Sequence, residues 1–258
     1  MMDRCRCCVL VAGCAIIILA VVVGEPVNFK DPFIEDCKKK DKSTDCVKVW
    51  SAFEQAYVNR NPCKVLPEAY NQLMSVAPPQ PKPDLMLFWS GTKEVAHLVA
   101  KGCYQTIEDT LLGSVLDKKV WCGKEGSKET FTSGPECPSS SDCENNPVTS
   151  FWSRASAEFA AVASGKVVVL LDGSRTKPFY HLSVFAKIEL VGFKPDQVES
   201  LTVVLVTKEE FGDKCENTSL KELQEKLNPK IKYICKEVTE SKLIKWTKER
   251  GKSCKPCW

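Results

Sequence analysis

The side chains that could do chemistry in this chain are its cysteines and carboxylates rather than its histidines. The sequence holds 15 cysteines but only two histidines, His97 and His181, which lie far apart. Two distant histidines argue against a histidine base and against a histidine-rich metal site. From Cys37 onward the cysteines lack the paired C-x-x-C spacing of a zinc site, because the one such pair in that stretch, at 254–257, stands alone. We therefore expect disulfides, an oxidising compartment and no metal.

Common catalytic and nucleotide-binding motifs are absent as well. The sequence contains no P-loop, no G-x-G-x-x-G, no G-x-S-x-G and no H-E-x-x-H. Its 258 residues include 36 basic and 33 acidic side chains, which gives a net charge of +3 with the charges mixed along the chain. That balance argues against disorder and against a nucleic-acid partner, which would select a concentrated basic stripe.

Six short strings stand out together. They are LFWS at 87–90, TIEDTLLG at 106–113, CENNPV at 143–148, FW at 151–152 with Ser156, DGSR at 172–175, and Phe185 with Glu189. In this order and spacing the chain resembles the ADP-ribosyl cyclase/cyclic ADP-ribose hydrolase family of NAD glycohydrolases, from residue 37 to about residue 245. The layout is most similar to that of the family's type II lymphocyte ectoenzyme.

The resemblance implies an enzyme that cleaves the nicotinamide–ribose bond of NAD. The ADP-ribosyl group would become cyclic ADP-ribose or ADP-ribose, with base exchange on NADP as a further option. NAD is then the substrate, so no cofactor is implied, and a homodimer is possible because homodimers occur in the family. The alternative is a cell-surface receptor or adhesion protein that kept the fold with weak or no activity.

The resemblance also implies the site. Glu189 takes the role of the essential carboxylate, and Glu108 matches a glutamate that favours hydrolysis. The implied substrate-binding residues are Trp89, Ser90, Lys93, Asp109, Asp117, Trp152, Ser156 and Phe185. The chemistry fits this small set, because nicotinamide leaves as a neutral ring and needs no general acid. One carboxylate can then stabilise the oxocarbenium-like sugar.

Taken without the resemblance, the same residues have ordinary structural interpretations. Glu189 reads as an exposed strand position, and Trp152 reads as core packing on a helix. Glu108 and Asp109 fall in a capping box that begins at Thr106. The residues alone therefore do not single out Glu189.

Two departures from the family pattern concern phosphate binding. Gly91 stands where the lymphocyte enzyme has an arginine, and Val184 stands where it has a hydroxyl residue. Both contacts to phosphate are therefore missing, although Lys93 could supply charge.

The resemblance implies a disulfide set. It pairs Cys37 with Cys46, Cys63 with Cys143, Cys122 with Cys137, and Cys215 with Cys235. The lymphocyte enzyme's extra bridge is absent, because Pro83 and Ser164 occupy its positions. Trp246 replaces one partner of the family's last bridge, so we expect Cys254 to pair with Cys257 and Cys103 to remain free.

The N-terminus predicts the location. An apolar run at 9–23 follows Arg4 and Arg6, and it favours a signal anchor in a type II protein at the cell surface. A cleaved signal peptide, giving a secreted protein, is the alternative. Asn217 begins the one glycosylation sequon, Asn217-Thr218-Ser219.

The elements that would position the site follow from periodicity. Apolar spacing predicts helices at 46–57, 93–103 and 150–163, and apolar runs predict buried strands at 85–89, 167–171, 201–206 and 231–234. A capping box, Ser219 with Glu222, predicts a helix between the last two strands. We expect a helical subdomain (25–82 with 106–163) and a smaller α/β subdomain (83–105 with 164–258) with a short, mainly parallel four-stranded sheet. Residues 1–24 would form the tail and anchor, and the site would lie in the cleft between the subdomains.

Overall fold

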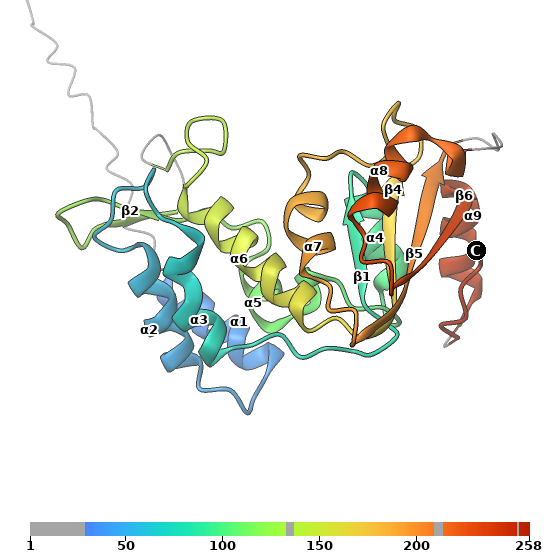
Figure 1. Ribbon diagram of the computed structural model, residues 1–258. Coiled ribbons are helices and arrows are strands. Elements are labelled where there is room, and N and C mark those ends of the chain that lie inside the picture. Colours follow the sequence, from blue (N-terminus) through green and yellow to red (C-terminus); the bar gives the residue numbers. More distant parts are fainter. Residues whose placement is uncertain (1–28, 133–136, 209–213, 252) are drawn as a thin grey trace, which may run out of the picture.

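The computed structural model describes residues 29–132, 137–208, 214–251 and 253–258. They form a helical part and a sheet part that lie side by side (Figure 1). The helical part holds α1 (Lys30–Lys40), α2 (Cys46–Tyr57), η1 (Pro67–Tyr70), α3 (Asn71–Val76), η2 (Ile107–Asp109), α5 (Leu111–Leu116), β2 (Cys122–Gly123), β3 (Thr130–Phe131) and α6 (Pro147–Ala161). The sheet part holds β1 (Leu87–Ser90), α4 (Lys93–Ala100), β4 (Gly165–Asp172), η3 (Phe185–Glu189), α7 (Leu190–Gly192), β5 (Val198–Thr207), η4 (Lys214–Glu216), α8 (Thr218–Lys226), β6 (Lys232–Thr239) and α9 (Glu240–Glu249).

Aromatic packing holds the helical part together. Helix α2 begins where the Asp45 side chain accepts hydrogen bonds from two backbone N–H groups of the first turn. Its apolar face buries Trp50 and Phe53. The Phe53 ring stacks on Phe33 of α1 at 5.1 Å between ring centroids and meets Trp121 at 5.2 Å. The helix predicted at 46–57 is therefore confirmed, with its bounds.

The sheet is fully parallel, in the order β1-β4-β5-β6. Strand β4 is buried on both faces: Val167 and Val169 pack into one core cluster, whereas Val168 and Leu170 pack into the other. Helices α4 and α9 cover the second face through Val95, Val99 and Leu243, and α6, α7 and α8 lie against the first. The predicted fold class is confirmed, and the continuous apolar runs are explained by burial on both sides.

Two of the segments that connect the helical part to the sheet part, around residues 84 and 165, are hydrogen-bonded to each other. Asp84, before β1, accepts a hydrogen bond from the backbone N–H of Lys166 at 2.8 Å and donates its own N–H to the carbonyl of Ser164 at 3.2 Å. Gly165 has φ +71°, and a Cβ there would lie 2.2 Å from the Asp84 carboxylate. The position therefore requires glycine, both for its backbone angle and for the close approach.

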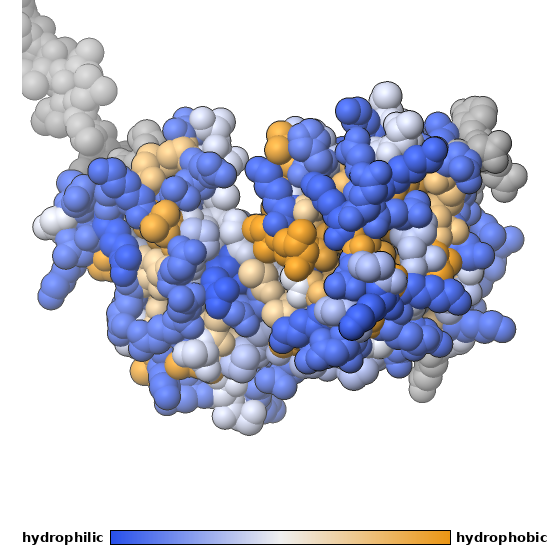
Figure 2. Space-filling view, in the orientation of Figure 1, coloured by the Kyte–Doolittle hydropathy of each residue, from blue (hydrophilic) through white to orange (hydrophobic). Residues whose placement is uncertain are grey.

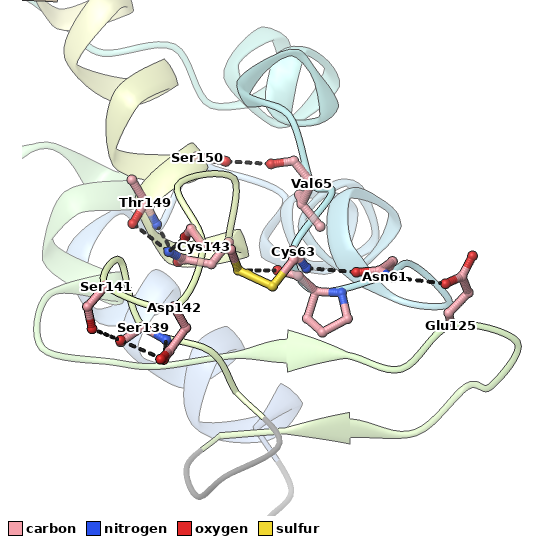
Figure 3. Close-up of a disulfide and its surroundings, with 12 residues drawn as sticks. Asn61, Cys63, Val65, Glu125, Ser139, Ser141, Asp142, Cys143, Thr149 and Ser150 are labelled. Atoms are coloured by element: carbon pink, nitrogen blue, oxygen red, sulfur yellow. Dashed lines mark hydrogen bonds between the residues drawn. A yellow bond between two sulfur atoms is a disulfide. The ribbon is translucent and has the colours of Figure 1, made fainter.

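Four of the predicted disulfides are confirmed, and the rest of the pairing is corrected. The confirmed pairs are Cys37–Cys46, Cys63–Cys143, Cys122–Cys137 and Cys215–Cys235. Figure 3 shows Cys63–Cys143 joining the segment after α2 to the loop before α6, where the Ser150 hydroxyl also donates to the carbonyl of Val65.

A fifth disulfide among the described residues joins Cys103 to Cys254 and leaves Cys257 without a partner there, so the expected pair of Cys254 with Cys257 is wrong. This pairing depends on tertiary packing, because α9 packs along α4 and so brings the C-terminal segment back to the end of α4. The Arg250 guanidinium fixes this return by donating to the carbonyls of Val99 and Lys101.

The start of α8 differs from the prediction. Asn217, rather than Ser219, caps the helix, because its Oδ1 accepts the backbone N–H of Ser219 at 2.9 Å. The same side chain donates from Nδ2 to the carbonyl of Thr176 at 3.0 Å. Glycosylation of Asn217 stays a prediction.

Among the described residues, no helix has both the length and the apolar character that crossing a bilayer requires. The anchor predicted at 9–23 lies outside the described residues.

Candidate active site

A cavity of about 510 Å³ lies where the two parts meet. Strand β1, the turn after it, η2, residues 117–120, α6 and η3 line its walls. On the face seen in Figure 2, hydrophobic residues gather over the η3–α7 region beside the furrow between the parts, and the exposed ones in this segment are Leu182, Val184 and Val191. Nine of the ten predicted catalytic and substrate-binding residues line the cavity: Trp89, Ser90, Lys93, Glu108, Asp117, Trp152, Ser156, Phe185 and Glu189.

Glu189 is buried at the cavity wall, with 6% of its surface exposed, and not on a strand. Glu189 is the last residue of a π-helical turn, η3. At the start of this turn, the hydroxyl oxygen of Ser183 accepts a hydrogen bond from the backbone N–H of Ala186 at 3.1 Å. Such turns carry an extra residue and are frequent at functional sites. The ordinary interpretation of Glu189 as an exposed strand position is therefore wrong.

The surroundings of Glu189 keep its carboxyl group protonated to a high pH. The pKa of Glu189 is raised from 4.5 to about 8, mainly by burial and to a smaller extent by the charge of Glu108, while the hydrogen bond from the Ser156 hydroxyl acts to lower it. Ser156 thus touches the carboxylate itself. A group poised in this way, inside a cavity, is typical of a catalytic acid or base.

Glu108 reaches the cavity from η2 and contacts the β1 side of the site. Its Oε2 accepts a hydrogen bond from the Trp89 indole N–H at 3.4 Å, and its Oε1 lies 3.6 Å from Nε2 of His97. The Trp89 and His97 rings meet edge to face at 6.5 Å between centroids. Glu108 therefore holds one wall of the cavity in place.

Asp109, which is predicted to contact the substrate, is not among the residues that line the cavity. Its carboxylate accepts hydrogen bonds from the backbone N–H of Thr106 at 2.9 Å and from the Thr106 hydroxyl at 3.1 Å. The capping box at Thr106 is confirmed, and Glu108 lies in the turn that it closes. Gly113 packs against the same turn, since a Cβ there would lie 2.0 Å from the carbonyl oxygen of Ile107.

The charged side chains of the cavity are partly neutralised by neighbours. Lys93 Nζ lies 3.0 Å from Asp117 Oδ1, and Lys119 Nζ lies 3.0 Å from Asp36. Lys119 was not predicted from the sequence, nor were Lys118 and Val120 beside it. Nothing in their local sequence marks them, because the fold alone brings residues 117–120 to the cavity.

Trp152 serves both the core and the cavity. It packs edge to face on Phe151 at 5.1 Å between centroids, as its ordinary interpretation expects, and it also lines the cavity. Trp89 and Trp152 come from β1 and α6, so each part of the molecule contributes one indole. Two flat aromatic surfaces suit a planar cationic ring. The described residues contain no group of His, Cys, Asp or Glu that could hold a metal ion.

Comparison with known proteins agrees with the geometry. The sequence profile of the family described as ADP-ribosyl cyclase matches residues 25–255. The chain belongs to this family. Mouse ADP-ribosyl cyclase/cyclic ADP-ribose hydrolase 1 is 33% identical over 234 residues, covering 83% of this chain and 76% of that protein. The ADP-ribosyl cyclase/cyclic ADP-ribose hydrolase of Aplysia californica is 33% identical over 196 residues, covering 72% and 67%.

Solved structures of ADP-ribosyl cyclases share this fold. Porcine CD38 complexed with a covalent intermediate, ribo-F-ribose-5'-phosphate, has a TM-score of 0.76 at 32% identity, covering 83% of this chain and 96% of that one. Aplysia cyclase complexed with substrate NGD and product cGDPR has a TM-score of 0.75 at 26% identity, covering 89% and 97%.

Proposed function

We propose that this chain is an NAD glycohydrolase that converts NAD to nicotinamide and to cyclic ADP-ribose, ADP-ribose or both, with NADP as a second substrate. The observation that carries the proposal is the buried Glu189 carboxyl group in a cavity that two tryptophans line. Membership of the ADP-ribosyl cyclase family supports the reaction class.

Substrate binding would activate Glu189. In NAD the nicotinamide ring is cationic, and the indoles of Trp89 and Trp152 offer surfaces for it. A positive charge beside Glu189 favours its ionised form and lowers its pKa, which burial holds at about 8 in the empty protein. The Ser156 hydroxyl, which hydrogen-bonds this carboxylate, would keep it aimed at the reacting ribose.

Bond cleavage then needs little further help. The nicotinamide–ribose bond breaks with both electrons going to the ring nitrogen, so the leaving group is neutral and needs no proton. The ribose carbon gains positive charge, and the buried Glu189 carboxylate stabilises it. Attack by an adenine ring nitrogen gives the cyclic product, and attack by water gives ADP-ribose.

Glu108 is the residue we propose to influence this choice. It lies in the cavity, its charge acts on Glu189, and it holds Trp89, the indole over which the freed adenine could fold. A carboxylate near the reacting carbon also offers an acceptor for a water proton.

The compartment is part of the proposal. The five disulfides of the described residues support an oxidising location, and a signal anchor at 9–23 would place the catalytic part outside the cell, as in the family's type II ectoenzyme. A secreted form is the alternative. A homodimer is a further possibility that the family suggests.

The test incubates purified protein with NAD and separates nicotinamide, cyclic ADP-ribose and ADP-ribose by chromatography. Release of nicotinamide that the Glu189→Gln variant lacks supports the enzyme. A folded protein that releases none would favour the receptor or adhesion function on the same fold.

A further inference from the structure

Gly91 has no side chain, but the space beside it is filled by a cation. An ideal Cβ on Gly91 would lie 2.8 Å from Cζ of Arg175, 2.9 Å from its Nη2 and 3.1 Å from its Nη1. Gly91 also has φ +76°, a backbone angle that favours glycine. The Arg175 guanidinium, from the turn after β4, therefore occupies the position that a side chain on residue 91 would take.

Asp172 holds Arg175 in this place. Asp172 ends β4, and its Oδ2 accepts a hydrogen bond from Arg175 Nε at 3.1 Å. Its Oδ1 accepts the backbone N–H of Ser174 at 3.0 Å, which fixes the turn between them. In the part of the chain that the structure describes, no protein group accepts a hydrogen bond from Nη1 or Nη2 of Arg175, and about half of this side chain is exposed, 51%.

The position lies between two cavities. Gly91, Trp89 and Lys93 line the candidate active site and also a neighbouring cavity of about 480 Å³. The second cavity lies at the carboxyl ends of β4 and β5, beside Asp172 and Thr207. The carboxyl edge of a parallel sheet is the usual ligand-binding edge in such folds. Arg175 lines neither cavity, but its guanidinium lies against Gly91, which lines both, so a ligand that extends from one cavity into the other would pass beside it.

The charges of this corner are mixed, because Glu94, Asp172 and Glu240 line the second cavity together with Lys93 and Lys208. Lys93, the cation nearest in sequence to Gly91, is paired with Asp117 at 3.0 Å. The hydroxyl of Thr92, which precedes α4, donates to the carbonyl of Leu170 rather than capping the helix, so the N–H groups of the first turn also face this side without a side-chain acceptor. A guanidinium held at Nε, with both Nη groups free, presents the fork that binds phosphate oxygens in pairs.

We infer that Arg175 binds a phosphate of the substrate's pyrophosphate where it crosses Gly91, and so supplies from the turn after β4 the contact that residue 91 cannot make. The inference rests on the proposed function for its substrate. Arg175 is on this reading a substrate-binding residue that selects nucleotides carrying a pyrophosphate.

The test measures binding directly, by titration calorimetry with ADP-ribose and with adenosine, which lacks phosphate. Arg175→Gln should weaken ADP-ribose binding by about 10-fold or more, the usual range for losing charge-assisted hydrogen bonds, and leave adenosine binding unchanged. Arg175→Lys should recover part of the loss, since charge remains without the fork. Lys177→Gln, an exposed cation two residues along the same turn, is the matched control and should bind as the parent does.

Unchanged ADP-ribose binding by Arg175→Gln, or an equal loss with Lys177→Gln, would overturn the inference, as would a parent protein that does not bind ADP-ribose. Nicotinamide release is measured in a separate assay, so a negative result in these binding experiments would overturn the inference on Arg175 without overturning the proposed function. Conversely, Arg175-dependent binding by a protein that releases no nicotinamide would support the inference and remove the proposed enzyme.

Discussion

The indole N–H of Trp89 donates to Glu108 Oε2 at 3.4 Å and so joins β1 of the sheet part to η2 of the helical part. The same carboxylate raises the pKa of Glu189 through its charge. One acidic side chain therefore orients an aromatic wall of the cavity and also influences the protonation of the Glu189 carboxyl group.

Replacing Glu108 by Gln separates these two roles, because the amide oxygen still accepts from Trp89 while the charge is lost. The pKa of Glu189 should fall, so the acidic limb of the kcat/KM profile for nicotinamide release should move to lower pH. The cyclic share of the product should rise. A profile and a product ratio both equal to those of the parent would contradict the role given to Glu108.

Glu189→Gln should remove most of the activity. It keeps the size of the side chain and its contact with Ser156 but removes the charge that stabilises the sugar cation. We expect kcat to fall by about 10²–10³ or more. Glu199→Gln, on an exposed position of β5, is the matched control and should be fully active. A folded Glu189→Gln protein within a few-fold of the parent rate would remove Glu189 from the mechanism.

The same variant should change how stability depends on pH. Burial raises the pKa of Glu189 to about 8 in the folded protein, whereas the unfolded value is near 4.5. Between these values the folded state binds more protons than the unfolded state, so this group's contribution to stability is lost as the pH rises from about 4.5 to about 8.

The Glu189→Gln variant has no carboxyl group at this position, so its stability does not fall over this pH range on account of residue 189. Its Tm should match the parent near pH 4 and exceed it at pH 9, by on the order of 5–10 °C. Calorimetry at both pH values measures the difference. A constant offset between the two proteins would show that the carboxyl group does not titrate as described.

Trp152 should tolerate Phe better than Ala. Trp152→Phe keeps a flat ring in the cavity and on Phe151, so part of the activity should survive. Trp152→Ala removes both and should raise KM for NAD and also lower Tm. Steady-state kinetics with thermal unfolding distinguish binding from packing, and equal kinetics for the two variants would argue against ring stacking.

The corrected disulfide gives a further prediction. Cys254→Ser should lower the free energy of unfolding by about 2–4 kcal/mol, since the Cys103–Cys254 bridge closes a loop of 151 residues, whereas Cys257→Ser should change it little. Denaturant titration measures both. Peptide mass mapping without reduction should find Cys103 bonded to Cys254, and a Cys254–Cys257 peptide would contradict the structure.

Much of the fold could be predicted from the sequence, because local patterns decide it. The apolar run of β4 and the aromatic face of α2 follow directly from burial. The Cys103–Cys254 pair could not be predicted, because it depends on α9 packing along α4. The start of α8 was misplaced because two residues close together, Asn217 and Ser219, can both cap a helix.

The site was predictable only in part, and by resemblance rather than by spacing. Glu189 lies in a sequence that reads as an exposed strand, and only its contact with α6 and the π-helical turn bury it. Asp109 stays a prediction as a substrate contact, and its hydrogen bonds to Thr106 show that an acidic residue beside Glu108 can also serve the turn itself. Arg175 and Gly91 are 84 positions apart, so no local pattern reveals their contact.

The bonds of Asp84 have a consequence for motion. Lys166 donates its backbone N–H to Asp84, and Asp84 donates its own N–H to the carbonyl of Ser164, so both bonds lie at the sheet-part end of the two connecting segments. A rotation of the helical part against the sheet part keeps these bonds only if the two segments bend together, on the helical side of residues 84 and 164. We therefore expect the two segments to act as one paired hinge rather than as two independent ones, with Gly165 leaving no slack between them.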